Sequence, residues 1–163
     1  MIITYFAYGS NMAPAVMSRL CPRHRYLGVA KLAGYRLAFT RRSRKTGTGV
    51  ADVVVSEGDE VWGTVYEIAE SDLPPIDRKE GFDWAYTKVL LPVTLDADCS
   101  ERTAMMYTVV SKESAEIAPS RAYLNGIIAA ARTRGLPDGY VTRLATIRAA
   151  EDEQGRPETQ LEG

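Results

Sequence analysis

The sequence has few of the residues on which disulfides, metal sites and nucleophilic triads are usually built. It contains 1 histidine and 2 cysteines among 163 residues, and Cys21 and Cys99 lie too far apart to form a C-x-x-C pair. We therefore expect two unpaired thiols in a reducing compartment and no zinc or redox role. His24 lies in the basic segment CPRHRY, which favours a solvated side chain over a catalytic Ser-His or Cys-His pair.

Motifs for metal and nucleotide binding are also missing. The sequence has no H-E-x-x-H, Walker A or G-x-G-x-x-G motif, and the glycine-rich residues 47–49 are typical of a hairpin turn and not of a phosphate loop. We therefore expect no metal and no cofactor.

Long apolar runs and a large net charge are missing as well. No stretch reaches the roughly 18 apolar residues of a membrane helix, and the net charge of -1 argues against nucleic-acid or membrane partners. The first residues, MIITYFAYGS, favour a strand over a signal peptide, so we expect a soluble cytoplasmic protein. The basic run at 41–45 predicts a solvated hairpin tip, and a role in attracting an anionic substrate stays open.

What is present is the composition of a globular domain, with 45% hydrophobic and 25% charged residues. We expect one domain over residues 1–150 and a polar tail over 151–163. Short segments rich in β-branched and aromatic residues predict strands at 2–7, 25–31, 35–41, 50–56, 61–68, 86–95 and 103–110. Gly34 is expected to mark a turn between two of them.

Helical patterns lie near both ends of this strand-rich region. Residues 13–20 predict one helix, and Ser120, Gly135 and Pro137 mark the limits of a second. Val141, Leu144 and Ile147 indicate a third. The fold class is therefore α+β, a mainly antiparallel curled sheet or small β-barrel with flanking α-helices.

Residues 8–12 form the first candidate site. A small turn between a buried strand and a helix can present several backbone N-H groups to a carboxylate or phosphate. The alternative is an ordinary turn in which Ser10 or Asn11 caps the helix.

Residues 76–81 form the second candidate site, after two prolines. An exposed helical turn that ends at Gly81 is one interpretation. In the other, Phe82, Trp84 and Tyr86 partly bury the carboxylate of Glu80, raise its pKa and make it a competent base near neutral pH.

Four segments, taken in order, resemble the gamma-glutamylcyclotransferase family. They are FAYGSNM, IDRKEG, EGFDWAY and PSRAYLNGIIAAARTRGLPDGY. The resemblance implies that a single cavity holds the substrate, with Glu80 as general acid/base and Tyr86 and Tyr123 in the wall. It also implies that backbone N-H groups hold the glutamyl carboxylate, from the loop residues Tyr8, Gly9, Ser10 and Asn11.

The same resemblance implies a reaction in which a gamma-glutamyl group closes to 5-oxoproline and releases the attached amine or amino acid, as in glutathione metabolism. Gamma-glutamyl-amines and gamma-glutamyl-protected metabolites are alternative substrates. A non-catalytic small-acid binding or interaction domain on the same fold is a further alternative. The only partner expected is a small gamma-glutamyl substrate, and the chain leaves open whether it forms a homodimer.

Overall fold

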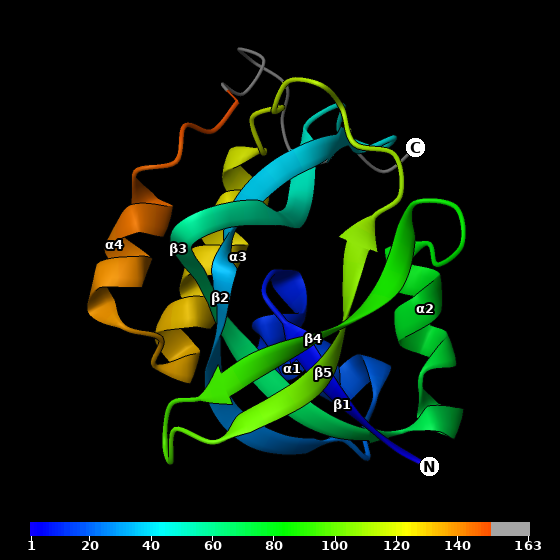
Figure 1. Ribbon diagram of the computed structural model, residues 1–163. Helices are drawn as coiled ribbons and strands as arrows, with labels where there is room; N and C mark the ends of the chain where they lie inside the picture. The colour runs from blue at the N-terminus through cyan, green and yellow to red at the C-terminus, as the bar shows by residue number, and fades with distance from the viewer. Residues whose placement is uncertain (151–163) are drawn as a thin grey trace.

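Within residues 1–150, the part of the chain that this computed structural model describes, five strands close into a barrel (Figure 1). The strands are Ile2–Ala7 (β1), Arg25–Arg42 (β2), Gly49–Ala69 (β3), Tyr86–Leu95 (β4) and Glu101–Val109 (β5). Their order is β1-β3-β2-β4-β5, with β1 parallel to β5 and the other pairs antiparallel. This confirms the predicted α+β class and small barrel. The expected tail at 151–163 lies outside the described residues.

The two long strands β2 and β3 each join two of the predicted shorter strands. Ala33 pairs with Glu60 and Tyr35 pairs with Val55, so residues 56–59 bulge out opposite Gly34. Gly34 adopts a φ of +82°, which a glycine tolerates without strain. The prediction of a turn at Gly34 is therefore wrong, because the glycine forms a β-bulge inside a continuous strand.

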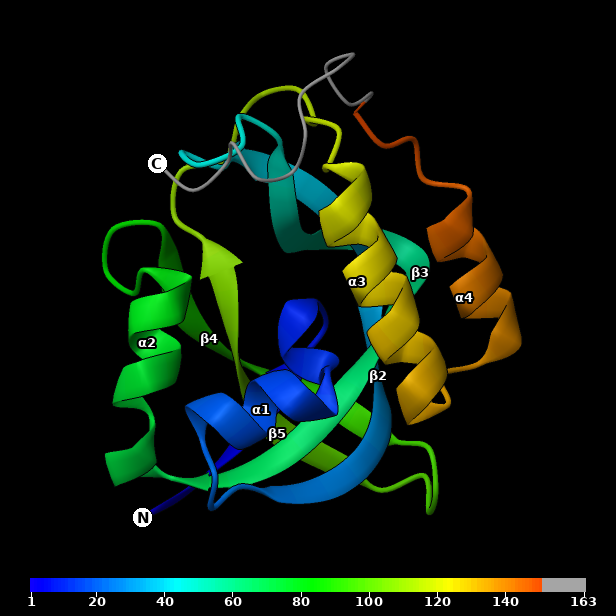
Figure 2. The same cartoon turned by 180° about the vertical axis from the view of Figure 1, so that it is seen from behind.

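Helices flank the barrel, and Figure 2 shows them from behind. They are α1 (Pro14–Leu20), α2 (Pro74–Glu80), α3 (Arg121–Arg134) and α4 (Asp138–Ala145), with 3-10 turns at Ser10–Met12 (η1) and Glu70–Asp72 (η2). The Ser120 side chain caps α3 and Gly135 ends it at a φ of +74°, as predicted. None of the helices in residues 1–150 has the length and apolar character needed to cross a membrane.

A close approach between β1 and β3 fixes where the first candidate loop begins. A Cβ atom at Gly63 would lie 2.3 Å from the Ala7 carbonyl oxygen and 2.7 Å from the Phe6 ring. Only glycine leaves room for the end of β1 at this point. The fully buried Phe6 ring therefore packs against β3, and the chain leaves the barrel directly after Ala7.

Candidate active site

A cavity lies where β1 ends and η1 begins. This cavity is lined by every residue that the sequence predicts for the site. They are Tyr8, Gly9, Ser10, Asn11, Glu80, Tyr86 and Tyr123. The cavity is completed by Tyr5, Phe6, Ala7, Ala51 and Tyr107. The closed barrel thus brings together residues from β1, η1, β3, α2, β4, β5 and α3.

The loop after β1 carries backbone donors without partners. No hydrogen bond within residues 1–150 uses the N-H groups of Gly9, Ser10 or Asn11. The carbonyl side of the same turn is held, because Tyr66 donates to the Asn11 carbonyl at 2.9 Å and Arg134 donates to the Met12 carbonyl at 2.9 Å. Free N-H groups on a fixed loop beside a cavity suit a carboxylate.

Glu80 is the last residue of α2, and Gly81 ends the helix with a φ of +65°. The Glu80 side chain is only 18% exposed, and its Oε1 atom accepts a hydrogen bond from Asn11 Nδ2 at 2.9 Å. Burial raises the pKa of the Glu80 carboxyl, and the Lys79 ammonium 3.8 Å away offsets part of that shift. The interpretation of an exposed helical turn is therefore wrong for Glu80 itself.

The rings that surround the cavity differ from those expected around Glu80. Of the three aromatic residues that follow it in sequence, only Tyr86 lines the cavity, while Trp84 is 57% exposed. Phe82 instead packs under the Lys88 ammonium, which lies 4.0 Å from the ring centroid. The expectation that Phe82 and Trp84 bury the carboxylate is thus not met, because tyrosines of distant strands and of α3 enclose the cavity.

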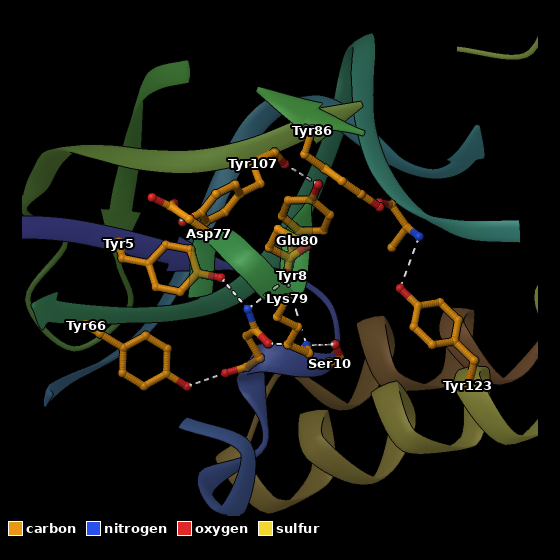
Figure 3. Close-up of polar contacts among 12 residues, drawn as sticks. Tyr5, Tyr8, Ser10, Tyr66, Asp77, Lys79, Glu80, Tyr86, Tyr107 and Tyr123 are labelled. Carbon is orange, nitrogen blue, oxygen red and sulfur yellow. Dashed lines mark hydrogen bonds and ion pairs between the residues drawn. The ribbon is translucent and has the colours of Figure 1, made fainter. Parts of the chain in front are cut away.

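Asn11 connects the loop to Glu80 through its side-chain amide. Figure 3 shows Tyr5, Lys79, Glu80 and Ser10 gathered beside this loop. The Nδ2 atom of Asn11 donates to the Tyr5 hydroxyl at 2.8 Å and to Glu80, while its Oδ1 atom accepts from Lys79. Lys79 Nζ also donates to Ser10 Oγ at 2.7 Å. Because an ammonium only donates hydrogen bonds, Lys79 fixes the amide with its N-H groups toward the carboxylate. Asn11 is 3% exposed, so this orientation is maintained inside the protein.

The tyrosine hydroxyls of the wall are held by the backbone. Tyr86 donates to the Ala51 carbonyl at 2.8 Å, the Ala51 N-H donates to the Tyr123 hydroxyl at 3.1 Å, and Tyr8 donates to the Tyr107 carbonyl at 2.5 Å. Burial raises the pKa of Tyr123 to about 12 and raises the pKa of Tyr86 further. These phenols therefore stay neutral at physiological pH, and Glu80 is the cavity group suited to exchange protons there.

Three polar side chains at the site were not predicted from the sequence. Tyr5 and Tyr107 lie on strands where an aromatic residue fits a core position equally well. Lys79 precedes Glu80 in a charged segment, and nothing in that segment distinguishes it from a solvated lysine. Only the contacts of Lys79 with Ser10 and Asn11 identify its place.

The comparisons with known proteins agree with one another. A model of the AIG2-like family matches residues 60–144. The gamma-glutamylcyclotransferase of Homo sapiens is 33% identical over 147 residues, which cover 88% of this chain and 77% of that protein. The protein of the same name from Bos taurus is 31% identical over 163 residues, covering 97% of this chain and 85% of its own.

A likeness of fold accompanies the likeness of sequence. A solved structure of a gamma-glutamyl cyclotransferase superposes with a TM-score of 0.87 and 29% identity, over 99% of this chain and 96% of that one. The sequence of this chain thus matches these proteins over most of its length. The same chain has the barrel, the flanking helices and the cavity at the end of β1. This chain belongs to the gamma-glutamylcyclotransferase family, a family of enzymes.

Proposed function

We propose that this protein cyclises a gamma-glutamyl group to 5-oxoproline and releases the attached amine, with Glu80 as general acid/base. The observation that carries the proposal is the Glu80 carboxyl itself, which lines the cavity beside a loop of free backbone N-H groups. Membership of the gamma-glutamylcyclotransferase family supports the same reaction.

In this proposal the loop binds the glutamyl α-carboxylate. The N-H groups of Gly9, Ser10 and Asn11 have no partner within residues 1–150 and lie on the cavity wall. Tyr8 precedes them, and Tyr86 and Tyr123 form the wall on the side of Ala51. A substrate held by its carboxylate would have its α-amine and γ-carbonyl in the part of the cavity that Glu80 lines.

In this reaction one C-N bond forms and another breaks, and the only other steps are proton transfers. Glu80 takes a proton from the α-ammonium, and the free amine attacks the γ-carbonyl carbon, which closes a five-membered tetrahedral adduct. Glu80 gives this proton to the leaving nitrogen, and the bond from the carbon to that nitrogen breaks. The ring nitrogen passes its second proton to the released amine, which leaves the lactam 5-oxoproline and an ammonium. Intramolecular attack can reach effective molarities of about 10⁵ M or more, and general acid-base catalysis adds on the order of 10²- to 10⁴-fold.

The electrostatic environment of Glu80 suits both steps. Burial raises its pKa, so that the carboxyl both accepts and returns a proton more readily near neutral pH than a free glutamate does. The Lys79 ammonium and the Asn11 amide stabilise the ionised form, which keeps the carboxylate available as a base. We place this reaction in the cytoplasm and in the turnover of glutathione-type gamma-glutamyl compounds, and it invokes no metal or cofactor.

A panel of gamma-glutamyl compounds tests the proposal. The purified protein is incubated with gamma-glutamyl-amino acids and with gamma-glutamyl-amines, including the compound in which the gamma-glutamyl group is attached to the side-chain amine of lysine. Mass spectrometry measures 5-oxoproline and each released amine. We expect 5-oxoproline and the amine in equal amounts from at least one class. Binding of 5-oxoproline without turnover of any compound would favour the alternative of a non-catalytic binding domain.

A further inference from the structure

Arg134, the last residue of α3, contacts the loop after β1 without lining the cavity. Its Nε atom donates to the Met12 carbonyl at 2.9 Å, and its Nη2 atom donates to the Tyr66 hydroxyl at 3.3 Å. The guanidinium carbon also lies 3.9 Å from the centroid of the Tyr26 ring, as in a cation-π contact. These contacts hold one partly buried cation at a fixed place beside the loop.

Tyr66 extends the contact of Arg134 to a second carbonyl of the loop. Its hydroxyl donates to the Asn11 carbonyl at 2.9 Å, and Figure 3 shows this hydroxyl directed toward the loop. Tyr66 has no exposed surface, and burial raises the pKa of its phenol, so the hydroxyl keeps the proton that it donates. Arg134 thus reaches two successive carbonyls, one directly and one through Tyr66.

Each of these two carbonyls belongs to a peptide group whose N-H donates back into the turn. The Asn11 carbonyl shares its peptide group with the Met12 N-H, which donates to the Gly9 carbonyl at 3.1 Å. The Met12 carbonyl shares its peptide group with the Ala13 N-H, which donates to the Ser10 carbonyl at 3.2 Å. Because a trans peptide group is planar, with its carbonyl and its N-H on opposite sides, each peptide group passes the contact on.

The two chains of hydrogen bonds end at N-H groups on the cavity wall. The Gly9 carbonyl shares its peptide group with the Ser10 N-H, and the Ser10 carbonyl shares its peptide group with the Asn11 N-H. Neither of these N-H groups has a partner within residues 1–150. One chain therefore runs from Arg134 through Tyr66 to the Ser10 N-H, and the other runs from Arg134 to the Asn11 N-H.

Both chains begin at a positive charge, and every link in them donates toward the cavity. Hydrogen bonds linked in this way polarise one another, by about 10–30% per bond. Arg134 takes part in none of the ion pairs between side chains of residues 1–150, so no carboxylate there neutralises its charge. The N-H groups at the two ends should therefore be stronger donors than those of an ordinary turn.

We propose that Arg134 is a positioning residue for the carboxylate site, which aligns and polarises the Ser10 and Asn11 N-H groups through the two chains. The inference rests on the function proposed above, because it deepens the role given there to the loop. Loss of the guanidinium should weaken the binding of a carboxylate and leave the proton transfers of Glu80 in place.

Arg134→Met tests this role, since methionine is unbranched and has neither a charge nor an N-H donor. Calorimetry should show a Kd for 5-oxoproline that is about three- to tenfold higher than that of the wild type, as for the loss of one hydrogen bond. The KM for a gamma-glutamyl substrate should rise with it, while kcat stays near the wild-type value. Arg132→Met is the control, because it removes an exposed arginine from the same last turn of α3 and should keep the wild-type Kd.

Tyr66→Phe separates the two chains, because it removes the hydroxyl and keeps the ring. In NMR spectra of isotope-labelled wild type, 5-oxoproline should move the amide proton signals of Ser10 and Asn11 to lower field. Tyr66→Phe should reduce this change at Ser10 and keep it at Asn11, whereas Arg134→Met should reduce both. A contribution of Arg134 to stability alone would not produce such a selective pattern.

Two kinds of result would overturn the inference. A wild-type Kd in Arg134→Met, or an equal loss of affinity in Arg132→Met, would show that this guanidinium does not support the site. Amide signals of Ser10 and Asn11 that 5-oxoproline does not move in the wild type would remove the site itself. Failure of the proposed reaction is distinct, since it would be seen as missing 5-oxoproline in the substrate panel, and the binding and NMR measurements would still decide the role of Arg134.

Discussion

At the scale of single residues, Lys79 favours the ionised form of Glu80. Its ammonium lies 3.8 Å from the carboxylate and lowers the pKa that burial raises. Lys79→Gln should therefore move the pKa of Glu80 further up, and the acid limb of the pH-rate profile should move to higher pH. The substrate amine titrates identically in both proteins, so the difference between their kcat profiles reports the enzyme.

The control for this experiment is Arg78→Gln, which removes an exposed cation from the same helix. Its acid limb should coincide with that of the wild type. A limb that stays in place or moves to lower pH in Lys79→Gln would refute the electrostatic role of Lys79. A rise in KM alone would indicate that Lys79 acts only through the loop residues Ser10 and Asn11.

The residues of the site differ in how far the sequence could predict them. Glu80 and the loop residues lie in short segments that resemble a known family, and the structure brings them to one cavity. The groups that surround Glu80 could not be predicted locally, because its partner Asn11 lies 69 positions away in the chain. The roles of these residues in binding and catalysis stay proposals.

At the scale of elements, the turn from β1 into η1 is expected to form the carboxylate site. Gly9 has a φ of -127°, and an added Cβ would lie 3.7 Å from Ala51 Cβ and 3.8 Å from the Tyr123 hydroxyl, which are ordinary contacts. Gly9→Val should therefore fold, while its extra bulk beside the cavity raises KM for a gamma-glutamyl substrate by about tenfold or more.

Steady-state kinetics and thermal unfolding check this prediction together. Gly139→Ala on α4 is the control, because an added Cβ there meets no atom within 4 Å. A folded Gly9→Val protein with the wild-type KM would exclude the loop as the carboxylate site.

The limits of α3 and the bulge at Gly34 show which elements a sequence can predict. Ser120 and Gly135 act on their own helix, so their effect follows from neighbouring residues. The effect of Gly34 depends on the partner strand, where residues 56–59 lie opposite a single position. Local signals predicted strand-forming segments on both sides but could not show that they form one continuous strand.

At the scale of the whole molecule, the buried Asp52 carboxylate of β3 forms hydrogen bonds with β2 and β5. Asp52 has no exposed surface and accepts hydrogen bonds from Thr40 Oγ1 at 2.7 Å, from the Val109 N-H at 3.1 Å and from Lys112 Nζ at 2.6 Å. Asp52→Ala leaves the Thr40 hydroxyl and the Val109 N-H without this acceptor, and Lys112 Nζ keeps only its hydrogen bond to the Val109 carbonyl at 3.0 Å. We expect a loss of about 3 kcal/mol or more in the free energy of unfolding.

Urea titration measures this loss. Glu57→Ala, in the exposed bulge of β3, is the control and should change the free energy of unfolding by less than about 0.5 kcal/mol. If Asp52→Ala were as stable as Glu57→Ala, the barrel would not depend on this contact.

Whether Glu80 carries the proton is tested by comparing Glu80→Gln with the wild type in both binding and turnover. Glutamine keeps the shape of the side chain and can accept the Asn11 hydrogen bond, but it cannot carry the proton. Calorimetry with 5-oxoproline measures binding, and mass spectrometry of a gamma-glutamyl substrate measures its release. We predict near wild-type binding of 5-oxoproline and a loss of turnover of on the order of 10²-fold or more. Turnover of Glu80→Gln at the wild-type rate would show that Glu80 is not the general acid/base.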